Sequence, residues 1–437
     1  MQNHLSMYVL DTRPDLSKVY NPSNILHLLT AFDVNWRISA IDTVNLDIED
    51  RWIYPINLNN HYRISRSLSA VKGAGIVYYD AIDAGIHRCL LESDGHIILD
   101  HIREGFFVNE QFLEGLHEGL NEAGLPPEKI WLINGNMLSE LTYCDWLKRK
   151  NISMGINMIP FHGCYWLLAS HNWGQKKAQL RNRIHSDSKK VLGGERRGKS
   201  FVSFNGRLRS HRLQVVLFLY GMGIFEKGHI SFLAYGSRGE GNLSELQKMA
   251  SGMPFAEELL STIPGLMNKL PLALDVPTFD YHIDKKTYKE DMPWSSPDPS
   301  FYLDSYFSVV VDTCFYESMM LFLTPIIYKS IMNCHPFVYF GPAGALAELR
   351  RMGFKTFAPF IDESYDKLLD SHERMRLALV ETQRLANMPK SELHKMYCEL
   401  WPVLEYNFDL FWHGSAQRFG DAMQNAIWGR MGLNLLP

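Results

Sequence analysis

One pattern repeats along much of the chain: a short apolar run ends in a polar residue and is followed by a segment of helical periodicity. In the first third, such runs end at Asp80, Asp100 and Asn134. Between the last two, apolar residues recur at helical spacing after Asn109, which is a favourable N-cap residue. Strand, helix and strand joined by short connections form right-handed crossovers. The pattern therefore predicts a parallel sheet covered by helices.

The same alternation returns in the second half, with predicted strands at 201–204, 229–234, 306–311, 337–340 and 355–357. The last 70 or so residues have helical periodicity. Because 437 residues exceed what one core usually holds, we predict an α/β protein with two Rossmann-like domains and a helical C-terminus. The predicted parts are an N-terminal domain at 1–175, a basic linker or mobile loop at 176–200, a C-terminal domain at 201–390, and helices at 391–437 that pack back across the domains.

Cysteine usage and hydropathy exclude several protein classes. The six cysteines form no CxxC pair, which argues against a zinc site and fits a reducing cytoplasm. The longest apolar run, 213–225, has 13 residues and is too short to span a bilayer. The N-terminus has no charged segment leading into an apolar core, so no secretion signal is visible. We expect a cytoplasmic protein, and its net charge of −4 gives no global case for nucleic-acid binding.

Positive charge is concentrated in one stretch. Residues 176–212 contain twelve Lys or Arg residues and two acids, Asp187 and Glu195. One interpretation is a solvated basic loop, and the other is a surface that faces phosphate groups of a polyanionic acceptor or of a donor diphosphate. The predicted acceptor or DNA-binding residues are Lys176, Lys177, Arg181, Arg183, Lys189, Lys190, Arg196, Arg197 and Lys199.

Within this stretch, residues 193–200 match the phosphate-binding pattern G-x-x-x-x-G-K-S. That loop binds phosphate only where a buried strand precedes it and a helix begins at the lysine. Here polar residues precede the glycines, and the Phe-Val-Ser-Phe run that follows Ser200 is typical of a strand. We therefore predict that the match is accidental.

Polar residues at the carboxyl ends of parallel strands are the first candidates for a site. In the first half, Asp80, Asp83 and His87 follow a predicted buried strand, and any of the three is a candidate general base for an acceptor hydroxyl. The alternative is that Asp80 and Asp83 only cap the next helix.

In the second half, cations gather between the strand at 201–204 and the helix that follows it. Fixed guanidinium groups stabilise a leaving nucleoside diphosphate as its charge grows. Arg207 and Arg209 alternate in direction if extended, so one of them is expected to face the ligand. The predicted diphosphate-binding residues are Arg207, Arg209, His211 and Arg212.

Further candidates follow the strand at 337–340. Gly341 and Gly344 allow close backbone approach at a helix start, which favours an anion. With Pro342 they are the predicted donor-binding turn. Asp362, Glu363 and Tyr365 are candidates for binding sugar or ribose hydroxyls, and the alternative is an acidic helix cap.

The segments "FxSFNxRxRxHR" and "PFVxFGxxGxLxxLRxxGFKTFxxxIDESYD", with "WLINGN" earlier, resemble a group of phage, giant-virus and bacterial glycosyltransferase-like proteins. The resemblance covers about half of the chain. It implies the GT-B class: two Rossmann-like domains facing across a cleft, with the acceptor on the first, a nucleotide-sugar on the second, and no metal. It also implies phosphate contacts for Arg207, Arg209 and Arg212, and donor contacts around Gly341 and 362–366.

One departure from that group concerns the donor. Its members usually carry Thr-Glu-Lys before the penultimate strand, whereas this chain has Thr324, Pro325 and Ile326. Lys329 or Glu317 is a possible replacement on the same predicted helix. An altered donor or a loss of activity are the other interpretations.

Together these features predict a metal-independent glycosyltransferase, phage-encoded and acting in the host cytoplasm, that uses a nucleotide-sugar, with a UDP-sugar favoured and no other cofactor. Direct displacement would invert the anomeric centre. The favoured acceptor is a hydroxymethylated base in DNA, which the enzyme must flip out of the stack or meet single-stranded. The alternatives are a glycan, lipid or protein acceptor, or a non-catalytic nucleic-acid- or sugar-binding protein of the same fold. The oligomeric state is left open.

Overall fold

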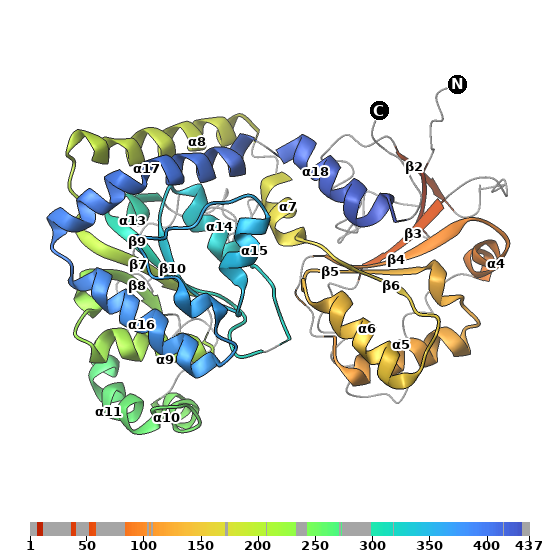
Figure 1. Cartoon of the computed structure of the whole chain (residues 1–437), viewed down its shortest axis with the longest axis horizontal. Coiled ribbons are helices and arrows are strands. Elements are labelled where there is room, and N and C mark those ends of the chain that lie inside the picture. Colours follow the sequence, from red (N-terminus) through yellow and green to blue (C-terminus); the bar gives the residue numbers. More distant parts are fainter. Residues whose placement is uncertain are drawn as a thin grey trace. The chain divides into compact units, whose positions relative to one another are not determined.

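A computed structural model gives the structure of the chain, drawn in Figure 1. It describes residues 7–11, 36–40, 52–57, 84–102, 105, 108–170, 174–206, 208–232, 243–270, 272, 299–317, 319–413 and 415–430. The predicted strand before Asp80 lies outside these ranges.

The chain forms two compact units. The first comprises Met1–Asn172, Met319–Phe322 and Ser415–Pro437, and the second comprises Trp173–Ser318 and Leu323–Gly414. The predicted boundary at 175 lies close to this division. The short segment Met319–Phe322 belongs to the first unit although its sequence neighbours belong to the second.

The first unit is built on a six-stranded parallel sheet of order β2-β1-β3-β4-β5-β6. Its strands are β1 (Met7–Asp11), β2 (Trp36–Ala40), β3 (Trp52–Asn57), β4 (Gly95–His101), β5 (Ile130–Asn134) and β6 (Asn157–Pro160). Its helices are α4 (Ala84–Glu92), α5 (Glu110–Glu122), η3 (Pro127–Lys129), α6 (Ser139–Lys150), α7 (Gly163–Ser170), α18 (Ser415–Met423) and η9 (Gln424–Trp428).

Helix α5 shows how the sequence builds the core of this unit. The Asn109 side chain accepts a hydrogen bond from the Phe112 amide at 2.8 Å and so caps the helix, as predicted. Phe112, Leu116 and Leu120 then recur on one helical face and pack into the buried cluster against β3, β4 and β5. Each Leu or Phe buried in this way stabilises the fold by about 1.5–3 kcal/mol.

The second unit is built on a four-stranded parallel sheet of order β10-β9-β7-β8. Its strands are β7 (Lys199–Asn205), β8 (Gly228–Phe232), β9 (Ser305–Val311) and β10 (Phe337–Phe340). Its helices are α8 (Gly174–Lys189), η4 (Lys190–Gly193), α9 (Ser210–Gly221), η5 (Phe225–Lys227), α10 (Leu243–Ser251), α11 (Ala256–Met267), α13 (Pro299–Leu303), α14 (Pro325–Met332), α15 (Ala345–Arg351), η8 (Ser364–Lys367), α16 (Ser371–Asn387) and α17 (Lys390–His413).

Helices cover both faces of this second sheet, with α8 and α17 side by side along one and α9 and α16 along the other (Figure 1). Every residue of β9 is buried, as expected for an inner parallel strand covered on both faces. The chain runs from β7 outward to β8 and then returns to the other side of β7 to form β9. The strand order therefore reverses between β7 and β9, and such a reversal is where ligands bind in open α/β sheets.

The predicted fold class, two α/β parts with parallel sheets and a helical C-terminus, is confirmed. Several boundaries differ. The stretch predicted as a linker at 176–200 is mostly helix, because α8 packs its Ile184 into the core and His185 against Glu405 of α17. Helix α17 belongs to the second unit, and only the chain from Ser415 onward belongs to the first. Residues 355–357 form no strand. No helix among the described residues is long and apolar enough to cross a membrane.

Candidate functional site at the carboxyl edge of the second sheet

Asn205, the last residue of β7, marks the strand reversal. Its side chain is fully buried, and its Nδ2 donates to the Ser231 carbonyl at 3.1 Å and to the Ser203 hydroxyl at 3.2 Å. These two acceptors fix the orientation of the amide, so Oδ1 points elsewhere. Among the described residues Oδ1 has no hydrogen-bond partner. A buried acceptor without a partner costs free energy unless a ligand or water supplies a donor.

Arg209 lies directly beyond, as the extended N-cap residue of α9. The side chain is half-buried, and its buried Nε has no partner in the described part of the chain. Arg207, the other predicted phosphate ligand on this loop, lies outside the described residues. The loop therefore presents at least one guanidinium donor for which no described residue supplies an acceptor.

His211 and Arg212 of α9 are buried and face the end of β9. The Nε2 atom of His211 lies 2.8 Å from the Asp312 carbonyl oxygen, so it must be the protonated nitrogen that donates. The Arg212 guanidinium donates to the carbonyls of Val311 and Asp312, each at 3.3 Å. Burial lowers the pKa of His211 to about 4, so the ring is neutral at pH 7. These two residues join the loop after β7 to the loop after β9.

Asp312, the first residue after β9, is the centre of a buried polar cluster that the sequence analysis did not single out. Its carboxylate accepts hydrogen bonds from the Thr313 amide and from the hydroxyls of Tyr339 and Thr324. Burial raises the pKa of Asp312 even though these donors favour the charged form. An apolar run ending in Asp was the available signal, and it was applied to Asp80 but not here.

The turn after β10 is already filled. Gly344 adopts a left-handed conformation with φ of 79°, and α15 begins at the next residue. The Asp366 carboxylate accepts from the amides of Leu346 and Ala347 at 2.9 and 3.1 Å, so it occupies the place predicted for a donor anion. Gly341 is required for packing, because a Cβ there would lie 2.1 Å from the Tyr339 ring. Pro342 accepts through its carbonyl from the Ala345 amide at 3.3 Å, inside the same turn.

Arg374 of α16 holds these loops together and was missed by the sequence analysis. It is buried and donates to the carbonyls of Gly341 at 3.1 Å, Leu368 at 2.6 Å and Phe315 at 2.5 Å. Its Cζ also lies 4.7 Å from the centroid of the Phe315 ring. An arginine on an amphipathic helix gives no signal that it turns inward, so only the tertiary structure reveals this role.

The predicted sugar-binding residues have partners within the protein. Tyr365 is buried, and its hydroxyl accepts from the Tyr339 amide at 3.0 Å. Glu363 accepts from the Phe357 amide at 2.6 Å and pairs with Arg350 at 3.0 Å. Asp362 is exposed and accepts from the Ser364 amide at 2.9 Å. Of the three, only Asp362 presents an exposed carboxylate.

Lys329 lies on the second turn of α14 and is half-buried. Burial lowers the pKa of its amine to about 8, because a charged amine is poorly solvated there. Side chains of a helix lean toward its N-terminus, which here is Thr324 beside Asp312 at the carboxyl edge of the sheet. The unusual Thr324–Pro325 sequence is explained by a cap: Pro325 is the first helical residue, and Thr324 accepts from the Ile326 amide at 3.3 Å.

In the first unit, Asp80 and Asp83 lie outside the described residues. His87 is described, on α4, with its Nε2 2.6 Å from the Ala123 carbonyl oxygen at the end of α5. That end of α5 precedes β5, so the contact draws His87 toward the amino edge of the sheet and not toward the carboxyl edge. The carboxyl edge carries buried polar residues that were not proposed, among them Asp100 and Asn134.

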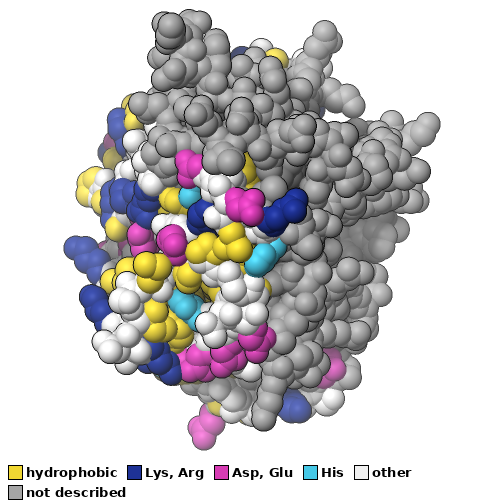
Figure 2. Space-filling model, turned by 90° about the vertical axis from the view of Figure 1, so that its right-hand side faces the viewer, with side chains coloured by type: hydrophobic (Ala, Val, Ile, Leu, Met, Phe, Trp, Pro, Cys, Tyr) yellow, Lys and Arg dark blue, Asp and Glu magenta, His cyan; other side chains and the backbone are white. Residues whose placement is uncertain are grey.

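Most of the described cations of the basic stretch have partners. Lys190 pairs with Asp187 at 2.7 Å, as does Arg183 at 3.6 Å, and Lys189 lies 3.7 Å from Glu405. Arg181 donates to its neighbour Asn182 at 3.0 Å. Arg196 is exposed, and the side chains of Lys176 and Lys177 are outside the described set. Figure 2 shows side chains of both charge signs among the described residues on one side of the first unit.

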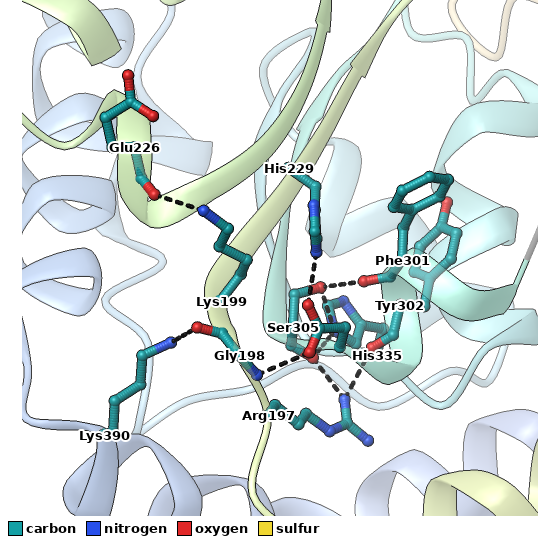
Figure 3. Close-up of polar contacts among 11 residues, drawn as sticks. Arg197, Gly198, Lys199, Glu226, His229, Phe301, Tyr302, Ser305, His335 and Lys390 are labelled. Carbon is teal, nitrogen blue, oxygen red and sulfur yellow. Dashed lines mark hydrogen bonds and ion pairs between the residues drawn. The ribbon is translucent and has the colours of Figure 1, made fainter. Parts of the chain in front are cut away.

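Figure 3 shows why the P-loop match is accidental. Gly198 and Lys199 lie at the amino edge of the sheet, and Lys199 begins strand β7, so no helix starts there. The Lys199 amine donates to the Glu226 carbonyl at 2.8 Å. A Cβ at Gly198 would lie 2.7 Å from the Asp304 carboxylate, which accepts from the Gly198 amide. Arg197 is buried and so is not available to contact an acceptor, contrary to the prediction.

No protein-family model matches the chain, and no curated protein matches it. Among solved structures it is similar to the trehalose-6-phosphate synthase OtsA, with 12% identity, a TM-score of 0.36, and 96% of this chain and 99% of that chain covered. It is also similar to the N-terminal domain of Candida albicans trehalose-6-phosphate phosphatase, with 9% identity, a TM-score of 0.39, and coverage of 96% and 97%. A UDP-forming α,α-trehalose-phosphate synthase from Burkholderia vietnamiensis matches at 14% identity and a TM-score of 0.35, with coverage of 96% and 99%. Likenesses this weak carry no argument about function.

Proposed function

We propose that the protein is a glycosyltransferase that binds a nucleotide-sugar, with a UDP-sugar favoured, at the carboxyl edge of its second sheet. The observation that supports this most is the arrangement at the strand reversal. There a guanidinium donor of Arg209 and a carbonyl acceptor of Asn205 are both buried and without partners among the described residues. A nucleoside diphosphate offers oxygens for the donor and base or ribose groups for the acceptor.

Two further cations would complete the diphosphate site. Arg207 is two residues from Arg209 on the same loop. Lys329 on α14 leans toward the same edge. Burial disfavours the protonated form of its amine, and an anion bound there would stabilise that form. His211 and Arg212, predicted as direct ligands, would instead position the loop through their bonds to the Val311 and Asp312 carbonyls. Fixed donors of this kind stabilise a leaving diphosphate without having to reorganise during the reaction.

In the proposed reaction the acceptor hydroxyl attacks the anomeric carbon, and the bond from that carbon to the diphosphate oxygen breaks. The nucleoside diphosphate leaves with the bonding electrons, and the acceptor proton passes to a base, for which Asp80 and Asp83 remain the candidates. Single displacement inverts the anomeric centre.

For the acceptor, the hydroxymethylated DNA base stays a prediction based on the 176–212 stretch. Because several of its cations are paired with acids, the cations available to phosphates are fewer than the sequence count of twelve. DNA affinity that falls steeply as salt rises from 50 to 200 mM would support it. An acceptor glycan, lipid or protein would instead give transfer that depends little on salt.

The donor site is tested by calorimetric titration of the full chain with UDP, GDP, CMP and TDP. We expect one nucleotide to bind, and Arg209→Ala to weaken it at least tenfold, which is about 1.4 kcal/mol. Arg196→Ala is the matched control, since it removes an exposed arginine from the opposite edge of the same sheet. If no nucleotide binds, or if both variants weaken binding equally, the proposed site is wrong.

A non-catalytic relative of the same fold is the second candidate, favoured by the Thr324-Pro325-Ile326 sequence, which the structure explains entirely as a helix start. The two candidates are separated by incubating the protein with the nucleotide-sugar whose nucleotide binds. Release of the nucleotide, by transfer or slow hydrolysis, supports an enzyme. Binding with no release, with every acceptor class supplied, supports the binding protein.

A further inference from the structure

Arg197 is a buried cation at the amino edge of the second sheet, on the side opposite the proposed donor site. Its side chain is only 5% exposed. One terminal nitrogen, Nη1, donates to the Tyr302 carbonyl at 3.0 Å and to the Ser305 carbonyl at 2.5 Å, as Figure 3 shows. These neutral acceptors hold the guanidinium in place but leave its positive charge without an anion.

The other edge of the same guanidinium is unused. Nε and Nη2 of Arg197 are both buried, and neither has a hydrogen-bond partner among the described residues. The hydrogens of these two nitrogens point in the same direction and form a fork that suits one anion. Elsewhere in this chain the same fork holds a carboxylate. The pairs are Arg351 with Glu348, Arg376 with Glu373, and Arg384 with Glu381.

No described acid takes that place for Arg197. The groups around it are hydroxyls, a thiol and aromatic rings. The Arg197 Cζ lies 4.0 Å from the centroid of the Tyr397 ring, and the guanidinium also interacts with the neutral Tyr397 hydroxyl. Ser188 is fully buried, and its hydroxyl interacts with the side chains of Tyr397 and Cys334, so it lies beside the same tyrosine as Arg197.

The neighbouring histidine cannot supply a counter-charge or compete for an anion. The Nε2 of His335 lies 2.6 Å from the Ser305 carbonyl oxygen and must donate to it, while its Nδ1 lies 2.7 Å from the Ser308 hydroxyl and accepts from it. Burial, and then the Arg197 charge, lower the pKa of His335 to about 3. The imidazole is therefore neutral and does not offset the charge of Arg197.

We infer that the Nε–Nη2 fork of Arg197, with the Ser188 hydroxyl, binds a small monovalent inorganic anion, chloride under physiological conditions. A lone buried charge is costly, and an anion in the fork both balances it and satisfies two buried donors. Because the atoms around the fork are buried, a nucleotide or carboxylate substrate has no access, whereas a single ion can be enclosed as the unit folds. The ion would fix the start of β7 and thus act on stability. This inference is independent of the proposed transferase activity.

Thermal unfolding of the full chain tests it, in sodium chloride, bromide or gluconate at one ionic strength. A ligand that binds only the folded state raises the midpoint in a saturable way. We expect chloride and bromide, but not gluconate, to raise the midpoint by a few degrees. Equal midpoints in all three salts would mean that the fork holds water or nothing, and would overturn the inference.

Variants locate the effect. Ser188→Ala is expected to raise the chloride concentration for half-saturation about tenfold, while Arg196→Ala, which removes the exposed neighbouring cation, leaves it unchanged. Arg197→Met removes the chloride dependence, if it folds. Crystals of the unaltered protein grown in bromide provide a second test that does not depend on the folding of this variant. An anomalous peak beside the Arg197 fork supports the site, and its absence at full bromide exchange contradicts it.

Discussion

Lys and Arg residues lie at both edges of the second sheet, but their surroundings differ. At the amino edge, Arg197 and Lys199 lead into β7, and at the carboxyl edge Arg209 and Arg212 follow it. At the amino edge the cations bind carbonyl oxygens of the protein itself. At the carboxyl edge Arg212 does the same. Both edges also keep a buried donor without a partner among the described residues, on Arg197 at the amino edge and on the half-buried Arg209 at the carboxyl edge.

The difference teaches that a run of cations has no single meaning. Arg197 and Arg212 are buried and bind main-chain carbonyls, so each helps to fix a loop. The two arginines with spare donors differ in access: Arg209 is half-buried and can meet a nucleotide, whereas Arg197 is buried and can meet only an enclosed ion. Whether an arginine finds acceptors depends on which segment ends lie beside it, because main-chain carbonyls lack partners where helices and strands stop.

The largest effect expected at the carboxyl edge comes from Arg374→Ala. The loops after β9 and β10 would lose a donor common to Gly341, Leu368 and Phe315, leaving buried carbonyls unpaired. We expect the free energy of unfolding to fall by about 4 kcal/mol in urea denaturation. Arg376→Ala on the same helix removes only an exposed pair with Glu373, and should leave the free energy of unfolding nearly unchanged. Similar losses in both would show that Arg374 does not hold the loops.

Acid should destabilise the two edges over different pH ranges. An unfolded histidine takes up a proton below about pH 6.5, whereas His211 at the carboxyl edge does so only near 4 and His335 at the amino edge near 3. Between these values the unfolded chain binds more protons, so stability is lost as the pH falls from 6.5. We expect each histidine to contribute on the order of 3 kcal/mol to this loss.

Urea denaturation at a series of pH values checks this. His211→Gln should reduce the slope between pH 6.5 and 4, and His335→Gln should reduce it down to pH 3. An unchanged slope in either variant would mean that the ring is already protonated in the folded protein.

A smaller contrast comes from one glycine at each edge. In Gly341→Ala the new Cβ would meet the Tyr339 ring. This ring is buried and its hydroxyl is hydrogen-bonded to Asp312, so it cannot move aside easily. We expect a loss of about 2 kcal/mol. In Gly198→Ala the Cβ would meet only the carboxylate of Asp304, which is half-exposed and can rotate away. We expect about 1 kcal/mol there. Thermal denaturation of both variants compares the edges, and a larger loss for Gly198→Ala would reverse the comparison.

Much of the fold was predictable because its signals are local. The N-cap at Asn109, the apolar runs that became β5, β9 and β10, and the strand character of the residues after Ser200 depend on near neighbours in the sequence. Local signals gave a wrong prediction for 176–200, where the polar composition suggested a linker. Helix α8 is stable there because Ile184 and His185 pack against distant residues of the unit.

The sequence by itself determined the alternation of strands and helices, the two α/β parts, and the stretch of cations flanking β7. Only the tertiary structure decided which cations are buried, that Asp366 fills the helix start predicted for an anion, and that Arg374 and Asp312 hold the carboxyl edge together. The physical reason is that secondary structure follows from periodicity within a segment. The role of a charged side chain depends instead on unpaired groups that distant segments bring to it.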